Sequence, residues 1–304
     1  MRLAIRYITR FLYTGAVWDS HNILRACPMS DERQRLIEYR VVTDPPTRVH
    51  AYTDYWGTRV DAFGVRVPHP RLEIVAEAVV ETRAPASPDW AGVITADATG
   101  DPGGRPTMTA LRSPEFVLAH LEFLAPSPHA RWEDELRARA EDWIAPAADD
   151  AVAAVGMLYR AVGETLRYLP GVTAVGVDVN AVLRQGAGVC QDFAHLLIAL
   201  CRSVGVPARY VSGYLLADGS GRGPEPGGGV VEVKTHAWVE VALSGIGWVA
   251  LDPTNGLPVG GYHVKIGHGR DYEDVMPLRG VYHGAAEHQL DVAVRMRELE
   301  GAQQ

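Results

Sequence analysis

The sequence predicts an α+β protein, in which a β-sandwich-like N-terminal module precedes a core of helices packed on an antiparallel sheet. Apolar residues alternate with polar ones through much of residues 1–85 and again from about residue 209, which is the period of strands. Between about residues 113 and 204 the apolar residues instead recur at helical spacing. Helices and strands of the second unit therefore come in separate blocks, which is typical of the α+β class.

The composition is that of a soluble globular protein long enough for two cores. Of 304 residues, 47% are hydrophobic and 22% are charged. The net charge of −8 and the lack of a long basic run argue against a nucleic-acid partner. No apolar stretch approaches the roughly 20 residues that a membrane span needs, so no membrane segment is expected.

The cysteines and the N-terminus favour a cytoplasmic protein. The three cysteines lack paired spacing, so a disulfide framework is not expected. Charged residues recur among the apolar residues of positions 1–20, which therefore lack the apolar region of a signal peptide. The sequence leaves the oligomeric state open.

The first module, residues 1–85, carries strand signals at the spacing of a sandwich. The candidate strands are the alternating stretch around Ile5, Tyr7 and Thr9, the segment 36–42, a hairpin over 52–65 and the stretch 72–82. Residues 86–112 are rich in Pro, Gly, Ala and Asp, and are expected to form a linker.

The core, residues 113–304 with its C-terminal strands, begins with helices. Ser113 followed by Pro114 is a helix start, because Ser caps well and Pro suits the first helical position. The predicted helices cover about 113 onward, 131–143, 148–166, 178–184 and a stretch beginning near Cys190. Strands follow from Arg209, interrupted by the glycine-rich segment 218–229, which is expected to be a mobile loop.

Cys190 stands where the run GAGVC enters an apolar helical pattern. Free backbone N–H groups and the helix dipole at such a start stabilise a thiolate, and Gly186 and Gly188 let the chain approach closely. Cys201 would lie about 16 Å further along the same helix, too far for a disulfide, and is expected in the core. Cys27 has no visible partner. Cys190 is therefore the candidate nucleophile.

A base and a carboxylate follow on two predicted strands. His236 lies in THAWVEV and Asp252 ends GWVALD. A three-residue loop at 243–245 would place the two residues opposite each other, with Cβ atoms roughly 5 Å apart. The carboxylate could then fix the imidazole tautomer and leave the other ring nitrogen for the sulfur, as in a Cys-His-Asp triad.

Each of these residues also has a plain structural interpretation when taken alone. Cys190 could be a buried thiol, His236 an ordinary strand histidine and Asp252 a turn former before Pro253. Asp192 could cap or orient the helix start, and His195 could be a core group. Trp238 could shield the ion pair or simply pack.

Further along the chain, a cluster of histidines and acids could suggest a metal site, but its spacing favours a solvated strand and turn: His263, His268, Asp271, Glu273 and Asp274. No metal and no cofactor are expected.

Three motif blocks, GVCQDFAHLLIALCRSVGVPARYVSGY, THAWVEV and GWVALDPTN, resemble the core of the transglutaminase-like superfamily in its bacterial branch. VWDSHNILRACP, DYWGTRV and VPHPRLEI are similar to the β-rich region that precedes this core, and HVKIGHGRDYEDVMPLRGVYHG also fits that branch. The resemblance implies a papain-like fold, with Cys190 as nucleophile, His236 as general base and Asp252 as orienting acid. It also suggests an oxyanion donor upstream of the nucleophile, for which Tyr168 is the candidate, with Gln191 as a neighbouring candidate. Animal relatives bind calcium, but this sequence has no clustered carboxylate loop, so calcium binding is not expected.

The expected activity is acyl transfer at a peptide or side-chain amide through an acyl-enzyme. The triad does not distinguish water from an amine as the acceptor, and hydrolysis by a protease or amidase is favoured because bacterial relatives include hydrolases. The expected partner is a peptide or protein substrate. The alternative is a non-catalytic peptide- or protein-binding scaffold of the same fold.

Overall fold

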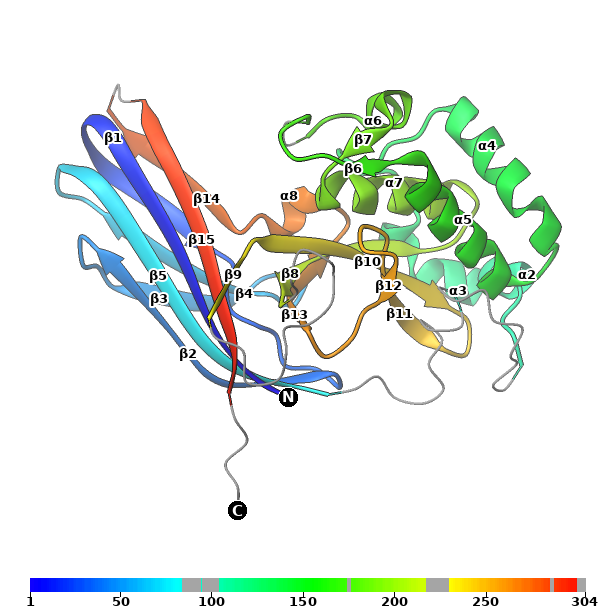
Figure 1. The fold of residues 1–304 in the computed structure, drawn as a ribbon, viewed down its shortest axis with the longest axis horizontal. Helices are drawn as coiled ribbons and strands as arrows, with labels where there is room; N and C mark the ends of the chain where they lie inside the picture. The colour runs from blue at the N-terminus through cyan, green and yellow to red at the C-terminus, as the bar shows by residue number, and fades with distance from the viewer. Residues whose placement is uncertain (84–93, 95–103, 174–175, 217–229, 285–286, 300–304) are drawn as a thin grey trace, which may run out of the picture.

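The computed structural model describes residues 1–83, 94, 104–173, 176–216, 230–284 and 287–299. Figure 1 shows a strand-rich half that contains the first and the last strands, β1 and β15, and a second half in which helices cover a smaller sheet. Most of the predicted linker and the predicted glycine-rich loop lie outside the described residues. Among the helices that are described, none is both long enough and apolar enough to cross a membrane.

The first half is an antiparallel half-barrel organised around one long strand, β1 (Arg2–Leu24). The first part of β1 pairs with β5 (His69–Thr82) and β15 (His288–Leu299). Its last part pairs with β4 (Arg59–Val65) and β14 (Leu278–His283). The remaining strands extend the two ends: β2 (Gln34–Asp44) on β5, β3 (Val49–Thr53) on β4, and β9 (Val231–Val233) on β15.

The strands at both ends of the chain meet in this half-barrel. The sequence pattern predicts that the C-terminal strands belong to the second unit, but residues 288–299 pair with residues 2–13 along the whole of β15. Strand β14 likewise pairs with β1. The first module therefore needs strands that follow the second unit in the sequence, so the two units are not separate segments of the chain.

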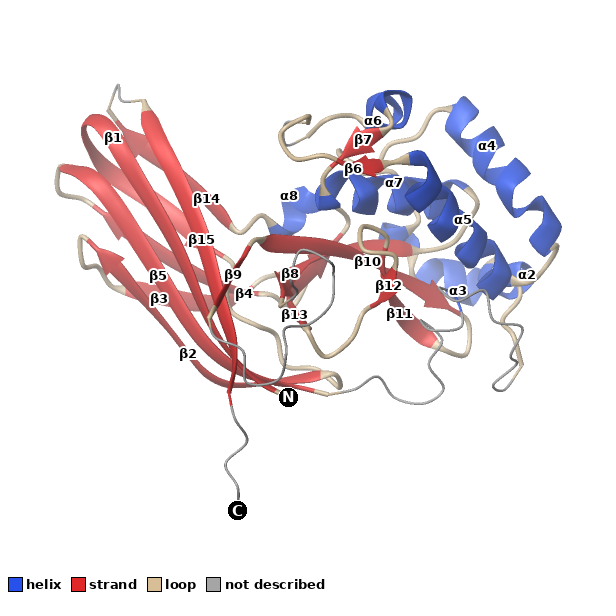
Figure 2. Ribbon diagram, in the orientation of Figure 1, coloured by secondary structure: helices blue, strands red, loops and turns tan. Residues whose placement is uncertain are grey.

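The α+β class is confirmed by the second half, in which helices precede and cover a sheet (Figure 2). The helices, including two short 3-10 turns, are α2 (Met108–Leu111), α3 (Pro114–Ala119), η1 (Leu121–Phe123), α4 (Asp134–Ile144), η2 (Ala145–Ala147), α5 (Ala151–Thr165), α6 (Val179–Gln185), α7 (Cys190–Ser203) and α8 (Tyr272–Val275). The predicted cap at Ser113 is present, because its side chain accepts a hydrogen bond from the N–H of Phe116.

The second sheet is antiparallel and has the order β12-β11-β10-β8-β13. Its strands are β8 (Ala208–Leu215), β10 (Thr235–Leu243), β11 (Gly247–Asp252), β12 (Leu257–Pro258) and β13 (His263–Gly269). A separate parallel pair joins β6 (Arg167–Tyr168) to β7 (Ala187–Gly188).

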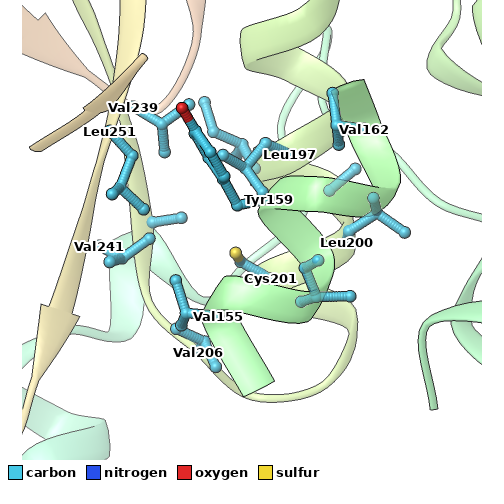
Figure 3. Close-up of a cluster of buried hydrophobic side chains, with 14 of the residues drawn as sticks. Val155, Tyr159, Val162, Leu197, Leu200, Cys201, Val206, Val239, Val241 and Leu251 are labelled. Atoms are coloured by element: carbon cyan, nitrogen blue, oxygen red, sulfur yellow. The ribbon is translucent and has the colours of Figure 1, made fainter. Parts of the chain in front are cut away.

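Helix α7 is the central helix of the second unit. Almost every residue from Asp192 to its end is buried, which explains the apolar run in the sequence. Figure 3 shows Leu197 and Cys201 of α7 on the side of Val239 and Val241 of the sheet, and Leu200 on the side of Val162. Cys201 is a core residue, as predicted, and its position in the helix body keeps it away from the start of α7.

The two halves share an apolar core and polar contacts. Tyr214 and Val264 of the second sheet are buried in the same cluster as Ile5 and Ile74 of the half-barrel. The side chain of Gln34 hydrogen-bonds both the N–H and the C=O of Lys265, at 2.8 Å each. Because a shift of the halves would expose this core, the half-barrel holds strand β13 in a fixed place.

Candidate active site

Cys190 is the first residue of α7, where the sequence predicts it. Gly186 ends helix α6 in the left-handed conformation, with φ +66°, and β7 then leads directly into α7. The Cys190 side chain is half-buried and lines a cleft. The sulfur therefore lies beside the free N–H groups of a helix start, where negative charge is stabilised.

Asp192 organises this helix start. Its Oδ2 atom accepts a hydrogen bond from the N–H of Val189 at 2.8 Å and another from the hydroxyl of Thr173 at 2.6 Å. The side chain is buried and bonds the residue before the helix, so it does not serve as a second base beside Cys190. The structure thus assigns Asp192 to capping, one of the two roles considered from the sequence.

His236 and Asp252 are in contact, but they are not opposite each other. Leu243 pairs with Gly247, so the hairpin loop is residues 244–246 and not 243–245 as the sequence analysis assumed. Because Val239 pairs with Leu251, this register places Asp252 across from Trp238 and makes His236 a diagonal neighbour on the same face. The Nε2 atom of His236 still lies 2.8 Å from Oδ2 of Asp252.

Asp252 is fully buried and surrounded by donors. Its Oδ1 atom accepts the N–H groups of Thr254 and Asn255, at 3.0 and 3.2 Å. Its Oδ2 atom accepts from the side chain of Asn255 at 2.7 Å, in addition to His236. Burial alone would raise the carboxyl pKa, but the neighbouring imidazoles outweigh it and hold the pKa of Asp252 well below its usual range. The group is therefore a fixed anion.

His236 carries a proton more readily than an ordinary histidine. Burial opposes the charge, but the anion of Asp252 and the hydrogen-bonded thiol of Cys190 together raise the pKa of His236 to about 10. Since Nε2 faces Asp252, Nδ1 is the ring nitrogen left for the sulfur. The arrangement favours the protonated, imidazolium form of His236.

Cys190 and His236 line a cleft of about 880 Å³ between the two halves, and Asp252 is buried behind His236. One wall comes from residues 168–171 and 189–191, and the other from β9 and the start of β10. The lining residues include Tyr168, Pro170, Gly171, Cys190, Gln191, Tyr210, Glu232, Lys234, His236, Asn255 and Tyr272. A chain or side chain of a substrate can therefore reach the sulfur.

The weaker candidates fall into two groups. Tyr168 and Gln191 both line the cleft; the Tyr168 side chain is 52% exposed, whereas the Nε2 atom of Gln191 is buried without a hydrogen-bond partner. Trp238 is fully buried behind the site, with its ring centroid 6.2 Å from that of His236. Gly213 leaves room for that ring, since a Cβ there would lie 2.3 Å from it.

The sequence interpretation of the histidine and acid cluster as a solvated strand and turn is wrong for His263 and Asp271. Both side chains are buried. Asp271 caps the start of α8 and accepts the N–H of His129. The Nε2 atom of His263 lies 3.2 Å from Oδ2 of Asp252. The other three members of the cluster have no contact with the catalytic candidates among the hydrogen bonds and ion pairs found here.

Among the described residues, His236, Asp252 and His263 form one group whose donor atoms are close enough to hold a metal ion. Both imidazole nitrogens, however, lie at hydrogen-bond distance from the same carboxylate oxygen. The Nδ1 atom of His263 accepts the N–H of Gly260, so its Nε2 carries hydrogen and offers no lone pair. The group is explained by hydrogen bonding.

Sequence reasoning missed His263, Asn255 and Tyr210 as neighbours of the site. Asn255 follows Asp252 by three residues in the turn DPTN, which is the one signal that could have revealed it. Tyr210 is buried in the cleft wall, and burial, with the nearby Cys190 second, raises the pKa of its phenol. His195 stacks on Tyr210 and accepts the N–H of Tyr272, so it supports this wall.

The other two thiols differ from Cys190. Burial raises the pKa of both Cys27 and Cys201 to about 12, against slight opposing effects of nearby arginines. Both side chains are buried, and neither lies among the cleft residues. Cys190 is therefore the thiol suited to nucleophilic chemistry.

Comparisons with known proteins agree with this architecture. Residues 137–253 match the model of the transglutaminase-like superfamily, and residues 3–81 match that of the bacterial transglutaminase-like N-terminal region. The uncharacterized protein ML0607 of Mycobacterium leprae is 36% identical over 298 residues, covering 98% of this chain and 99% of its own.

Two further comparisons bear on the fold and the core. The crystal structure of a proposed cysteine protease from Cytophaga hutchinsonii superposes with a TM-score of 0.72 at 21% identity, covering 99% of this chain and 92% of that one. A protein-glutamine gamma-glutamyltransferase of Pseudomonas aeruginosa is 29% identical over 142 residues, covering 42% of this chain and 20% of its own. The chain belongs to the transglutaminase-like superfamily, in its bacterial branch with the β-rich N-terminal region.

Proposed function

We propose that this protein is a cysteine-dependent acyl-transfer enzyme that acts on a peptide or side-chain amide. Water is the usual acceptor of the acyl group, so the reaction is hydrolysis. The observation that carries the proposal is the shared imidazole of His236. One of its nitrogens is held 2.8 Å from the buried Asp252, the ring and Cys190 line the same open cleft, and Cys190 is one of the groups that raise the pKa of His236. This is the arrangement that activates a thiol.

The reaction would proceed through a thioester. The Cys190 thiolate attacks the carbonyl carbon, and the carbonyl oxygen becomes an oxyanion. The C–N bond then breaks, and the imidazolium of His236 gives its proton to the leaving amine. Water next attacks the thioester, and His236 takes the water's proton. The acid product leaves, and Cys190 is again a thiolate beside the His236 imidazolium.

Two donors stand ready for the oxyanion. The backbone N–H of Cys190 is free at the helix start, because the first N–H groups of a helix have no partner within it. The side-chain amide of Gln191 is the second, since its Nε2 atom is buried in the cleft region with no hydrogen-bond partner. Tyr168 is more exposed and is the weaker donor.

Hydrolysis is favoured over amine transfer because water needs no binding site of its own. The likeness of the core to a protein-glutamine gamma-glutamyltransferase supports a carboxamide as the bond attacked, and keeps amine transfer as the second outcome of the same acyl-enzyme. The scaffold alternative is disfavoured, because a scaffold would have no need to retain an anion, an imidazole and an accessible thiol in contact.

The test compares Cys190→Ala with Cys201→Ala. Iodoacetamide at mildly acidic pH should label wild type and Cys201→Ala at one site, and should not label folded Cys190→Ala. A library of peptides, screened with and without a primary amine and read by mass spectrometry, should give products and a thioester adduct on Cys190. Equal labelling of all three proteins would refute an activated thiol at residue 190.

A further inference from the structure

Asp252 contacts a second imidazole besides His236. His263, at the start of β13, places its Nε2 atom 3.2 Å from the same Oδ2 atom. Its Nδ1 atom accepts the N–H of Gly260 at 3.2 Å, so the ring hydrogen must be on Nε2. His263 is therefore a donor to Asp252 in a fixed tautomer.

Burial is the main reason that His263 favours its neutral form. Burial lowers its pKa, and the nearby charges of His236 and Arg33 lower it further, against the opposing attraction of Asp252. Arg33 reaches this point from the half-barrel, and its guanidinium donates to the C=O of Val259 at 2.6 Å. Of the two imidazoles on Asp252, only His236 is thus free to gain and lose a proton during a reaction.

The turn that carries His263 is fastened to the half-barrel. The N–H of His263 donates to the C=O of Gly260, which closes the turn. The hydroxyl of Thr82, at the end of β5, donates to the C=O of Gly261 at 2.7 Å. The N-terminal amino group of Met1 in turn donates to the C=O of Thr82 at 2.8 Å. Together with Arg33, these contacts connect the first module to the triad carboxylate.

We propose that His263 is a positioning residue that holds the Asp252 carboxylate against His236, and that the half-barrel acts on the triad by fixing the turn that bears it. The inference rests on the proposed function, since it assigns a role in activating Cys190. It also gives the N-terminal module a task that does not depend on any ligand of its own.

The first test uses the protein without a substrate. Nitrogen-detected NMR of histidine side chains in wild type should show His263 as a neutral ring with hydrogen on Nε2 across the range in which free histidine, with pKa about 6.5, titrates. A His263 ring that titrates normally, or that carries its hydrogen on Nδ1, would overturn the proposal. This reading is independent of whether Cys190 reacts.

The second test compares His263→Phe, which removes the donor, with His263→Gln, whose amide can replace it. Iodoacetamide labelling of Cys190 at about pH 6 should slow roughly 10-fold in His263→Phe, the size expected for one hydrogen bond to a charged group, and recover to within about threefold in His263→Gln. At about pH 10, where the thiolate forms without help, the rates should converge. Equal rates at the lower pH would contradict the role of His263.

The third test separates the half-barrel from His263 itself. Thr82→Val removes the hydroxyl that fastens the turn, and Thr47→Val removes a hydroxyl that makes a similar 2.7 Å bond to the C=O of Gly64 within the half-barrel. Labelling at about pH 6 should slow by roughly two- to fivefold in Thr82→Val only. Equal effects of the two variants would contradict the proposed role of the half-barrel in fixing the turn that carries His263. An unreactive Cys190 in wild type would instead sink the proposed function.

Discussion

Gly188 lies so close to Asp192 that no side chain fits between them. A Cβ at residue 188 would be 2.6 Å from Oδ2 and 2.7 Å from Cβ of Asp192. The carboxylate is fixed in that place by the N–H of Val189 and the hydroxyl of Thr173. The glycine two residues before Cys190 is thus required by Asp192, which caps the helix that Cys190 begins.

Gly188→Ala should therefore displace Asp192 and destabilise the start of α7 by about 2 kcal/mol or more. Gly163→Ala is the matched control, because Gly163 lies in helix α5 with nothing within 4 Å of its missing Cβ. That change should stabilise the protein by about 0.5–1 kcal/mol. Urea denaturation measures both. A Gly188→Ala protein as stable as wild type would show that the helix start adapts.

Asp252→Asn should leave the fold intact and lower the rate of acyl transfer roughly 10⁴-fold. An amide at this position can present a donor to His236 Nε2, which favours the wrong imidazole tautomer. Asp178→Asn is the control, since Asp178 caps helix α6 and Asn caps equally well. Turnover of a peptide substrate found in the library screen provides the measurement, and a loss in both variants would point to instability.

The start of α7 could be predicted because its signals are local. A glycine-rich run, a cysteine and an unbroken apolar pattern stand together in the chain, and Ser113 and Asp178 announce their helices in the same way. The triad members could be named from three short motifs. Their contact depends on one hairpin, which fixes the face of each side chain by the alternation of strands.

The register of that hairpin could not be fixed from the sequence. Gly245 lies inside the loop and Gly247 directly follows it, and because both adopt positive φ, neither glycine alone marks where the loop ends. Moving the loop by one residue shifts the pairing by two, which keeps His236 and Asp252 on one face but makes them diagonal neighbours. The position of His263 was beyond prediction for a different reason: it depends on Thr82 and Arg33, which are distant in sequence.

Gln191→Met should separate the oxyanion role from thiol activation. The change keeps the shape of the side chain and removes its amide, so acyl transfer should slow roughly 100-fold. Labelling of Cys190 by iodoacetamide forms no oxyanion and should stay within about twofold of wild type. Tyr168→Phe should change either rate little, because the Tyr168 side chain is half exposed. Parallel losses in both assays of Gln191→Met would indicate a disturbed helix start.

Stability should fall on both sides of neutral pH, for opposite reasons. Burial lowers the pKa of His195, His263 and His268, to about 3 for His268. Below the unfolded value of about 6.5 the unfolded chain gains protons that the folded one does not, so stability is lost as pH falls. His236, with its pKa raised to about 10, contributes fully below 6.5 and loses its contribution as pH rises through 10.

Two variants test which histidine causes the loss of stability at acidic pH and which causes it at alkaline pH. His268→Gln removes a ring whose Nδ1 has no hydrogen-bond partner, so the urea midpoint should decline less between about pH 6.5 and pH 4 than in wild type. In His236→Gln the decline of the urea midpoint at acidic pH should be the same as in wild type, but its decline between about pH 8 and pH 10 should be smaller. If His236→Gln instead changed the urea midpoint only between about pH 6.5 and pH 4, the His236 imidazole would be neutral in the folded protein. The proposed reaction, which starts from a protonated His236, would then be wrong.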